Sequence, residues 1–175
     1  MSSEKWCIMA SNIVLIGFMG SGKSTIAGEL AGLLDTFALD TDSIIQNSTN
    51  LKISEIFAKY GEKAFRAHES HLIHWLSLNV SNAIIATGGG MPIFNDVRPM
   101  GKIVYLCIGF EEITKRLTPK ERAKRPLFGD KAKALELFHT RESIYKKTAD
   151  IIINASKSPQ EVCDEILHSF KPQIR

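Results

Sequence analysis

The stretch IVLIGFMGSGKSTIAGEL, residues 13–30, decides the fold of this chain. It begins with a short apolar run that predicts a buried strand, and it ends in a pattern that predicts a helix. Between the two, Gly17, Gly22, Lys23 and Ser24 complete the P-loop pattern G-x-x-x-x-G-K-[ST]. Because the pattern stands between a strand and a helix, as it must, we interpret the stretch as a phosphate-binding loop.

The residue types of this loop explain how it would bind phosphate. Its glycines let backbone N–H groups turn inward, and the start of the following helix adds partial positive charge. Lys23 can reach the β- and γ-phosphates of a nucleotide, and the Ser24 hydroxyl can ligate Mg²⁺. The loop alone does not say whether a phosphoryl group is transferred, or to what.

The composition of the chain is typical of a soluble globular domain. Its 175 residues are 44% hydrophobic and 23% charged, and the mean hydropathy is −0.03. No apolar run approaches the ~18–20 residues of a membrane span, and the first twelve residues lack the apolar core of a signal peptide. The cysteines Cys7, Cys107 and Cys163 are odd in number and have no metal-ligand spacing, which favours a reduced, cytoplasmic protein.

Positive charge is concentrated in one segment. Residues 115–133 hold eight lysines and arginines against two acidic residues, whereas the net charge of the whole chain is +3. A solvated loop, a nucleic-acid surface or a flap over a polyphosphate would each account for this segment. Phe128 is the single aromatic residue of this segment and no nucleic-acid motif is present, so we do not expect nucleic acid as a partner.

Short apolar runs alternate with helical patterns, which predicts a parallel sheet covered by helices. Residues 118–130 have weak periodicity and two prolines, so we predict an exposed loop there. Residues 41–78 form a mostly helical insert that the sheet does not require. The predicted strands are Asn12–Ile16, Phe37–Leu39, Ala83–Ala86, Lys102–Cys107 and Ile151–Ile153, and the predicted helices are Lys23–Leu34, Ile53–Asn79, Phe110–Leu117, Lys131–Ala149 and Pro159–Phe170. The last helix has a capping-box signature in Ser158 and Glu161.

Two acidic residues follow the second predicted strand. Asp40 and Asp42 lie at its carboxyl end, where ligands bind in open parallel sheets. One carboxylate near a metal ion and a second near an acceptor hydroxyl would suit phosphoryl transfer. Alternatively, Asp42 is the N-cap of a helix that begins at Ser43, because aspartate is favoured at that position. The sequence leaves both interpretations open.

Arg66 lies within the helical insert. A guanidinium there can bind a substrate carboxylate through two parallel hydrogen bonds. The alternative is a surface ion pair with Glu62 or Glu69, both of which are at helical spacing from it. The histidines of the same helix recur every three positions, which spreads them around its surface and does not favour a metal site.

Three consecutive glycines, Gly88, Gly89 and Gly90, follow the third predicted strand. A loop without side chains lets a ligand approach the backbone closely. Since a plain turn needs one or two glycines, we interpret this loop as part of a binding site. Arg125 in the basic segment and Arg141 on the helix after it are each compatible with a surface position, and only the other motifs favour an anion-binding role for them.

Together these motifs resemble the shikimate kinase family, over residues 13–170. The matching segments, in the family's order and at roughly its spacings, are LIGFMGSGKST, LDTDSII, GEKAFRAHE, ATGGG, KRPLF and RESIYKKTAD. The resemblance implies an α/β fold with a five-stranded parallel sheet in the order 2-3-1-4-5, of the nucleoside-monophosphate-kinase type. It also implies a single domain over residues 1–175, with its P-loop at 17–25, its substrate-binding insert at about 41–78 and its lid at about 118–130.

The resemblance further implies roles for residues on the nucleotide side. Ser24 would bind Mg²⁺ with Asp40 beside it, Arg125 would close over the transferring phosphoryl group with the lid, and Lys157 would lie near the adenine. The residues implied to bind ATP are Gly20, Ser21, Gly22, Lys23, Ser24, Thr25, Arg125 and Lys157.

Other residues are implied to act on the acceptor. Asp42 would contact shikimate hydroxyls and accept the proton, while Arg66 and Arg141 would bind the carboxylate. Gly88, Gly89 and Gly90 would shape the pocket. The residues implied to be catalytic are Lys23, Asp42 and Arg125.

The function implied is Mg²⁺-dependent transfer of the ATP γ-phosphoryl group to the 3-hydroxyl of shikimate, which yields shikimate 3-phosphate and ADP on the route to chorismate and aromatic amino acids. We expect ATP and shikimate as the partners, no membrane or nucleic acid, and a monomer. Two alternatives are a kinase for another carboxylated polyol, such as gluconate, and a nucleotide-binding regulatory module without catalytic activity.

Overall fold

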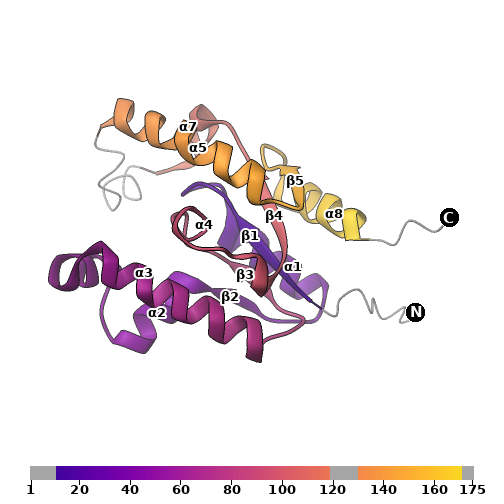
Figure 1. Ribbon diagram of the computed structural model, residues 1–175. Coiled ribbons are helices and arrows are strands. Elements are labelled where there is room, and N and C mark those ends of the chain that lie inside the picture. Colours follow the sequence, from indigo (N-terminus) through magenta and orange to yellow (C-terminus); the bar gives the residue numbers. More distant parts are fainter. Residues whose placement is uncertain (1–10, 119–129, 171–175) are drawn as a thin grey trace.

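Five parallel strands form one sheet in the computed structural model, which describes residues 11–118 and 130–170 (Figure 1). The sheet has the order β2-β3-β1-β4-β5, and every neighbouring pair is parallel. The predicted fold class and strand order are therefore confirmed. The strands are β1 (Asn12–Ile16), β2 (Ala38–Asp40), β3 (Ile84–Ala86), β4 (Gly101–Cys107) and β5 (Ile151–Asn154).

The central strands are apolar because both faces of the sheet are covered. All five residues of β1 are buried, as are all three of β3. Val14 lies between Ile85 on one neighbouring strand and Ile103 on the other. Every predicted strand is present, with bounds that differ by one residue at most.

Helices cover the sheet on both sides. α1 packs against α8 on one face, and α7 packs against β4 and α4 on the other. Figure 1 shows α3 and α7 near opposite ends of the row of strands, and α4 contacts both of them. The helices are α1 (Lys23–Leu33), α2 (Thr41–Thr49), α3 (Ile53–Asn79), α4 (Met91–Phe94), α5 (Phe110–Arg116), α7 (Lys131–Thr148) and α8 (Pro159–Phe170), with a 3₁₀ turn, η1, at Arg98–Met100. In the described ranges, no helix is both long and apolar enough to cross a membrane.

The predicted insert consists of α2 and α3, and α3 differs from the prediction in one respect. The sequence predicts one continuous helix over residues 53–79, but Gly61 has φ 79° and ψ 171°, which is not helical. Glycine adopts this positive φ without a steric penalty. The helix is therefore kinked at Gly61, and Arg66 lies in the part that follows the kink.

Polar side chains hold the start of α8, as predicted, and the start of β1, which was not predicted. The capping box of α8 is confirmed, because Ser158 N donates to Glu161 Oε2 at 3.0 Å and Glu161 N donates to Ser158 Oγ at 3.4 Å. At the start of β1, the buried Asn12 side chain donates to Val80 O at 2.9 Å and to Met100 O at 2.8 Å. Its Oδ1 accepts from Ala83 N at 3.0 Å, so Asn12 joins three chain segments at the amino end of the sheet.

Candidate active site

The P-loop follows β1 at the carboxyl edge of the sheet. α1 begins at Lys23, and its N-cap residue, Gly22, has no side chain to accept from the first-turn N–H groups. These donors are therefore available to an anion. The Lys23 side chain is buried, and its Nζ donates to Gly17 O at 2.8 Å and to Phe18 O at 3.0 Å, which holds the ammonium group within the loop.

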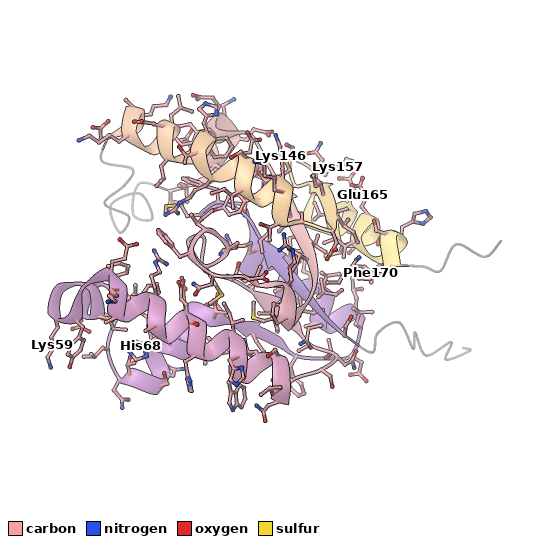
Figure 2. All side chains as sticks on the ribbon, viewed as in Figure 1. Lys59, His68, Lys146, Lys157, Glu165 and Phe170 are labelled. Atoms are coloured by element: carbon pink, nitrogen blue, oxygen red, sulfur yellow. The ribbon has the colours of Figure 1, made fainter. Side chains whose placement is uncertain are left out.

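A cleft of about 710 Å³ opens beside this loop. Lys157 lies on its wall, where the ammonium group pairs with Glu165 of α8, as Figure 2 shows. Hydrogen bonding to Glu165 raises the pKa of Lys157. Arg116, which we did not single out from the sequence, also lines the cleft, because α5 ends there. The lining residues are Gly20, Ser21, Gly22, Lys23, Ser24, Thr25, Ile26, Arg116, Leu117, Ala155, Ser156, Lys157, Ser158, Pro159 and Val162.

Asp40 connects α1 and α2 through two hydrogen bonds. Its Oδ2 accepts from Ser24 Oγ at 2.9 Å, and its Oδ1 accepts from Ser43 N at 3.0 Å. Asp40 is thus the N-cap of α2. The alternative that Asp42 is the N-cap is wrong, because α2 begins two residues earlier than that interpretation required.

Asp42 points instead toward the glycine loop, which consists of Gly88, Gly89 and Gly90. Its Oδ1 is buried and has no hydrogen-bond partner among the described residues. A Cβ added to Gly88 would lie 2.4 Å from this oxygen, so the carboxylate occupies the space that a side chain would need. Burial raises the pKa of Asp42, and the nearby Asp40 adds to this, while Lys23 and Arg66 act in the opposite direction.

Arg66 reaches the same loop from α3. A Cβ added to Gly90 would lie 2.8 Å from Arg66 Nη1, so this glycine makes room for the guanidinium. Arg66 pairs with both predicted partners, since Nη2 lies 2.8 Å from Glu62 Oε1 and Nη1 lies 2.9 Å from Glu69 Oε2. The pairing is not confined to the surface, however, because the Arg66 and Glu69 side chains are only 17% and 1% exposed.

The Arg66 guanidinium is further held by its surroundings. It lies over the Phe94 ring, 4.0 Å from the centroid, which is a cation–π contact. Glu69 also accepts from Asn95 Nδ2 at 3.2 Å. Burial raises the pKa of Glu69, whereas the hydrogen bond from Arg66 lowers it. Three of the five guanidinium N–H groups donate to Glu62 and Glu69, which leaves the edge near Gly90 for a further anion.

α7 approaches the glycine loop from the other side and carries Arg141. The Arg141 Nε atom is buried and has no partner in residues 11–118 and 130–170. One turn further along α7, Tyr145 Oη donates to Gly89 O at 2.6 Å. The glycine loop therefore lies against Asp42, Arg66 and the Arg141 turn of α7. The predicted lid arginine, Arg125, is outside the described residues.

The histidines of α3 do not form a metal site. No group of three or more His, Cys, Asp or Glu side chains suited to a metal ion occurs in the part of the chain that the structure describes. His68 instead lines a separate, smaller hollow between α2 and α3. The candidate catalytic and binding side chains therefore lie at the carboxyl edge of the sheet.

A P-loop and cleft on one side of this edge, and a buried carboxylate with arginines around a glycine loop on the other, define a P-loop kinase that acts on a small molecule. A family model described as "Shikimate kinase" matches residues 19–171. The chain belongs to this family.

Relatives and solved structures agree with the family. A shikimate kinase from Helicobacter hepaticus is 52% identical over 94% of this chain and 98% of its own. A shikimate kinase from Acinetobacter baumannii, solved in complex with shikimate, has a TM-score of 0.82 at 29% identity and covers 94% of this chain and 96% of that one. The enzyme from Aquifex aeolicus has a TM-score of 0.76 at 38% identity, with 91% and 96% covered. The predictions of family, fold and ATP-dependent kinase are therefore confirmed.

The predicted alternatives gain no support from these comparisons. A gluconokinase from Sinorhizobium meliloti has a TM-score of 0.53 at 14% identity, which is a likeness of fold alone. A regulatory module without an acceptor would not explain the Asp42 oxygen that lacks a partner in the described residues, nor the arginines beside the glycine loop.

Proposed function

We propose that this chain transfers the γ-phosphoryl group of ATP to the 3-hydroxyl of shikimate. In this reaction the hydroxyl oxygen forms a bond to the γ-phosphorus, the bond from that phosphorus to the β,γ-bridging oxygen breaks, and the hydroxyl proton leaves. The products are shikimate 3-phosphate and ADP. The observation that carries the proposal is the meeting of Asp42, whose Oδ1 has no partner among the described residues, with Arg66 at Gly88 and Gly90, beside the P-loop.

Asp42 is suited to receive the hydroxyl proton. A buried carboxylate oxygen without a partner is costly in a folded protein, so a ligand hydroxyl is the natural group to satisfy it. The raised pKa of Asp42 makes it a stronger base than an exposed aspartate. Its position against Gly88 would fix the direction from which the acceptor approaches.

Arg66 and Arg141 would hold the shikimate carboxylate between α3 and α7. Arg66 is already oriented by Glu62, Glu69 and the Phe94 ring, so little side-chain entropy is lost when it binds an anion. The buried Nε of Arg141 supplies a donor that the described residues leave unused. Fixing the acceptor in this way brings its hydroxyl close to the γ-phosphate.

The cleft beside the P-loop would hold ATP. The residues Gly20–Thr25 would bind its phosphates, Lys23 would neutralise charge on the β- and γ-phosphates, and Arg116 and Lys157 would flank the rest of the nucleotide. We keep the sequence-based prediction that Arg125 closes over the phosphoryl group with residues 118–130. Such a lid would keep water from the γ-phosphate.

Ser24 and Asp40 fit a Mg²⁺ ion carried by ATP. A hydroxyl and a carboxylate 2.9 Å apart are the hard oxygen donors that this ion takes in kinase sites. When bound, Mg²⁺ neutralises part of the charge on the phosphates. We expect the reaction to take place in the cytoplasm, where ATP is available, and the chain to act as a monomer.

Removal of Arg66 tests the acceptor site. We expect Arg66→Ala to raise the KM for shikimate by about 10- to 150-fold, because a charged hydrogen bond contributes about 1.5–3 kcal/mol. The KM for ATP should stay within about twofold, since Arg66 does not line the cleft. Steady-state kinetics with each substrate varied in turn gives both constants.

The controls separate binding from folding. Arg66→Lys keeps a positive charge for Glu69 and loses the bidentate fork, so it should fold and still bind shikimate weakly. Arg98→Ala removes the same charge at a position 62% exposed and should change neither KM. Equal increases in both constants for Arg66→Lys would contradict the assignment of Arg66 to the acceptor.

A further inference from the structure

A hydrogen bond from the core to the glycine loop is not explained by phosphate or carboxylate binding. The Tyr145 side chain is fully buried, and its Oη donates to Gly89 O at 2.6 Å, across 56 positions of the sequence. Burial raises the pKa of the Tyr145 hydroxyl to about 12, although the nearby Arg141 guanidinium acts in the opposite direction. The hydroxyl therefore stays protonated and remains a donor at any pH at which the protein works.

The same loop is held from its other side by α2. Gly88 N donates to Thr41 Oγ1 at 2.9 Å, and Thr41 is fully buried. The loop also lies close to the P-loop, because a Cβ added to Gly89 would meet Met19 N at 3.4 Å. Glycine residues have no side chains of their own to fix them, so these contacts from neighbouring elements add to the backbone hydrogen bonds from α4 in holding the loop.

Each of these two hydrogen bonds involves a residue that is close in the sequence to a residue proposed to bind the acceptor. Thr41 directly precedes Asp42, and Tyr145 follows Arg141 by one helical turn. The Thr41 bond therefore sets the distance from the loop to the Asp42 carboxylate. In the same way, the Tyr145 bond sets the distance from the loop to Arg141.

We propose that Tyr145 is a positioning residue for the acceptor site, and that its hydroxyl holds the Arg141 turn of α7 at a fixed distance from Gly89. This inference rests on the proposed function in assigning Arg141 to the acceptor carboxylate. Removal of the hydroxyl leaves Gly89 O without its donor and lets α7 and the loop shift relative to each other. Such a shift weakens acceptor binding and leaves the nucleotide cleft, which Tyr145 does not line, unchanged.

Tyr105 offers a matched control. It lies in β4, is 1% exposed, and its ring centroid is 5.3 Å from that of Tyr145. Tyr105→Phe removes a hydroxyl from the same buried aromatic pair without touching the glycine loop. Any general effect of a missing hydroxyl on core packing appears in this variant as well.

The test compares Tyr145→Phe with Tyr105→Phe in steady-state kinetics and thermal unfolding. We expect Tyr145→Phe to raise the KM for shikimate about fivefold, the ratio that corresponds to one net hydrogen bond. The KM for ATP should change by less than about twofold, and Tyr105→Phe should change neither constant. A lower Tm with both KM values unchanged would overturn the proposal and leave Tyr145 a purely structural residue.

A second readout does not need enzymatic turnover. Met91 N donates to Gly88 O and Ile93 N donates to Gly90 O, so these amides report on the glycine loop. We expect Tyr145→Phe to speed their hydrogen exchange relative to the amides of β1, and Tyr105→Phe to leave it unchanged. If the unaltered chain does not phosphorylate shikimate, the proposed function fails; if the Met91 and Ile93 amides exchange as before, the positioning role fails.

Discussion

In the proposed function, Asp42 is a single residue that serves function at the expense of stability. Its carboxylate is buried against Gly88, near a second carboxylate, and one oxygen has no partner among the described residues. Folding therefore favours the protonated form of the Asp42 carboxyl group, whereas its proposed role as proton acceptor requires the ionised form. The neighbouring Asp40 does not have this conflict, because it accepts from both Ser24 and Ser43.

Removal of the Asp42 charge should make the protein more stable and inactive. The pKa of Asp42 is higher in the folded chain than its ordinary value of 3.8. The stability that neutral Asp42 contributes is thus complete below pH 3.8 and is lost as the pH rises through the folded pKa. We expect Asp42→Asn to raise Tm near pH 7, with an advantage that shrinks on acidification, and to abolish turnover.

Thermal unfolding between pH 4 and pH 8 measures this difference. Asp164→Asn, which changes the same charge at an exposed position on α8, is the control. If Asp42→Asn were less stable than the unaltered chain at pH 7, the ionised carboxylate would be a stabilising group, and the conflict between stability and function at Asp42 would not exist.

Sequence reasoning reached the charged residues of the site and the Glu62 and Glu69 partners of Arg66, but not the other contacts that orient these residues. Asp42 and Arg66 could be singled out because motifs mark them. The choice of Asp40 rather than Asp42 as the cap depends on where α2 begins, and helix ends are poorly encoded in local sequence. Tyr145 and its bond to Gly89 depend on residues 56 positions apart, which no local pattern reveals.

At the scale of elements, the glycine loop after β3 leaves space for the side chains of Asp42 and Arg66. Gly88 makes room for Asp42, and Gly90 makes room for Arg66. Neither role depends on positive backbone φ angles, since both glycines lie outside that region. The requirement is for empty space, which a methyl group would fill.

Substitution of each glycine should therefore affect a different kinetic constant. Gly88→Ala would place its Cβ 2.4 Å from Asp42 Oδ1 and should lower kcat by about tenfold or more, because a small displacement of a catalytic group is costly. Gly90→Ala would displace the Arg66 guanidinium and should mainly raise the KM for shikimate. Kinetic constants of the two purified variants give the comparison.

Gly32→Ala is the matched control, because a Cβ there would have nothing within 4 Å. It lies in α1, where alanine is favoured over glycine by about 1 kcal/mol, so this variant should be slightly more stable and equally active. Unchanged activity in Gly88→Ala would show that the loop does not need to leave space for Asp42.

The elements themselves were largely predictable from the sequence. Continuous apolar runs identified β1, β3 and β4, because central strands of a parallel sheet are buried on both faces. The edge strands β2 and β5 were also predicted, although they are more exposed. The kink of α3 was missed, since a single glycine within a helical pattern is usually tolerated. α4 was also missed, because its four residues are too few to show a period.

At the scale of the whole molecule, the two ends of the sheet have different tasks. The carboxyl ends of the strands carry the site, while the amino end is fixed by Asn12, which bonds to Val80, Met100 and Ala83. β1 has five residues, so these ends lie roughly 15 Å apart at the rise of a strand. Stability at one end is thus separated from chemistry at the other.

Loss of the Asn12 side chain should destabilise the fold without changing substrate binding. We expect Asn12→Ala to lower the free energy of unfolding by about 3 kcal/mol, because buried groups lose their partners. Tm should fall by roughly 6–12 °C in a domain of this size, with both KM values unchanged. Urea unfolding and kinetics well below Tm test this, with the exposed Asn79→Ala as control. A raised KM for shikimate would show that the two ends are coupled.

The most direct test of the proposed function is ADP release from Mg-ATP with shikimate as the only acceptor, run beside gluconate and a control without acceptor. We predict rapid ADP release with shikimate alone, accompanied by an equal amount of shikimate 3-phosphate. Equal, slow ADP release in all three reactions would contradict this function, because the P-loop would then bind ATP without an acceptor site for shikimate.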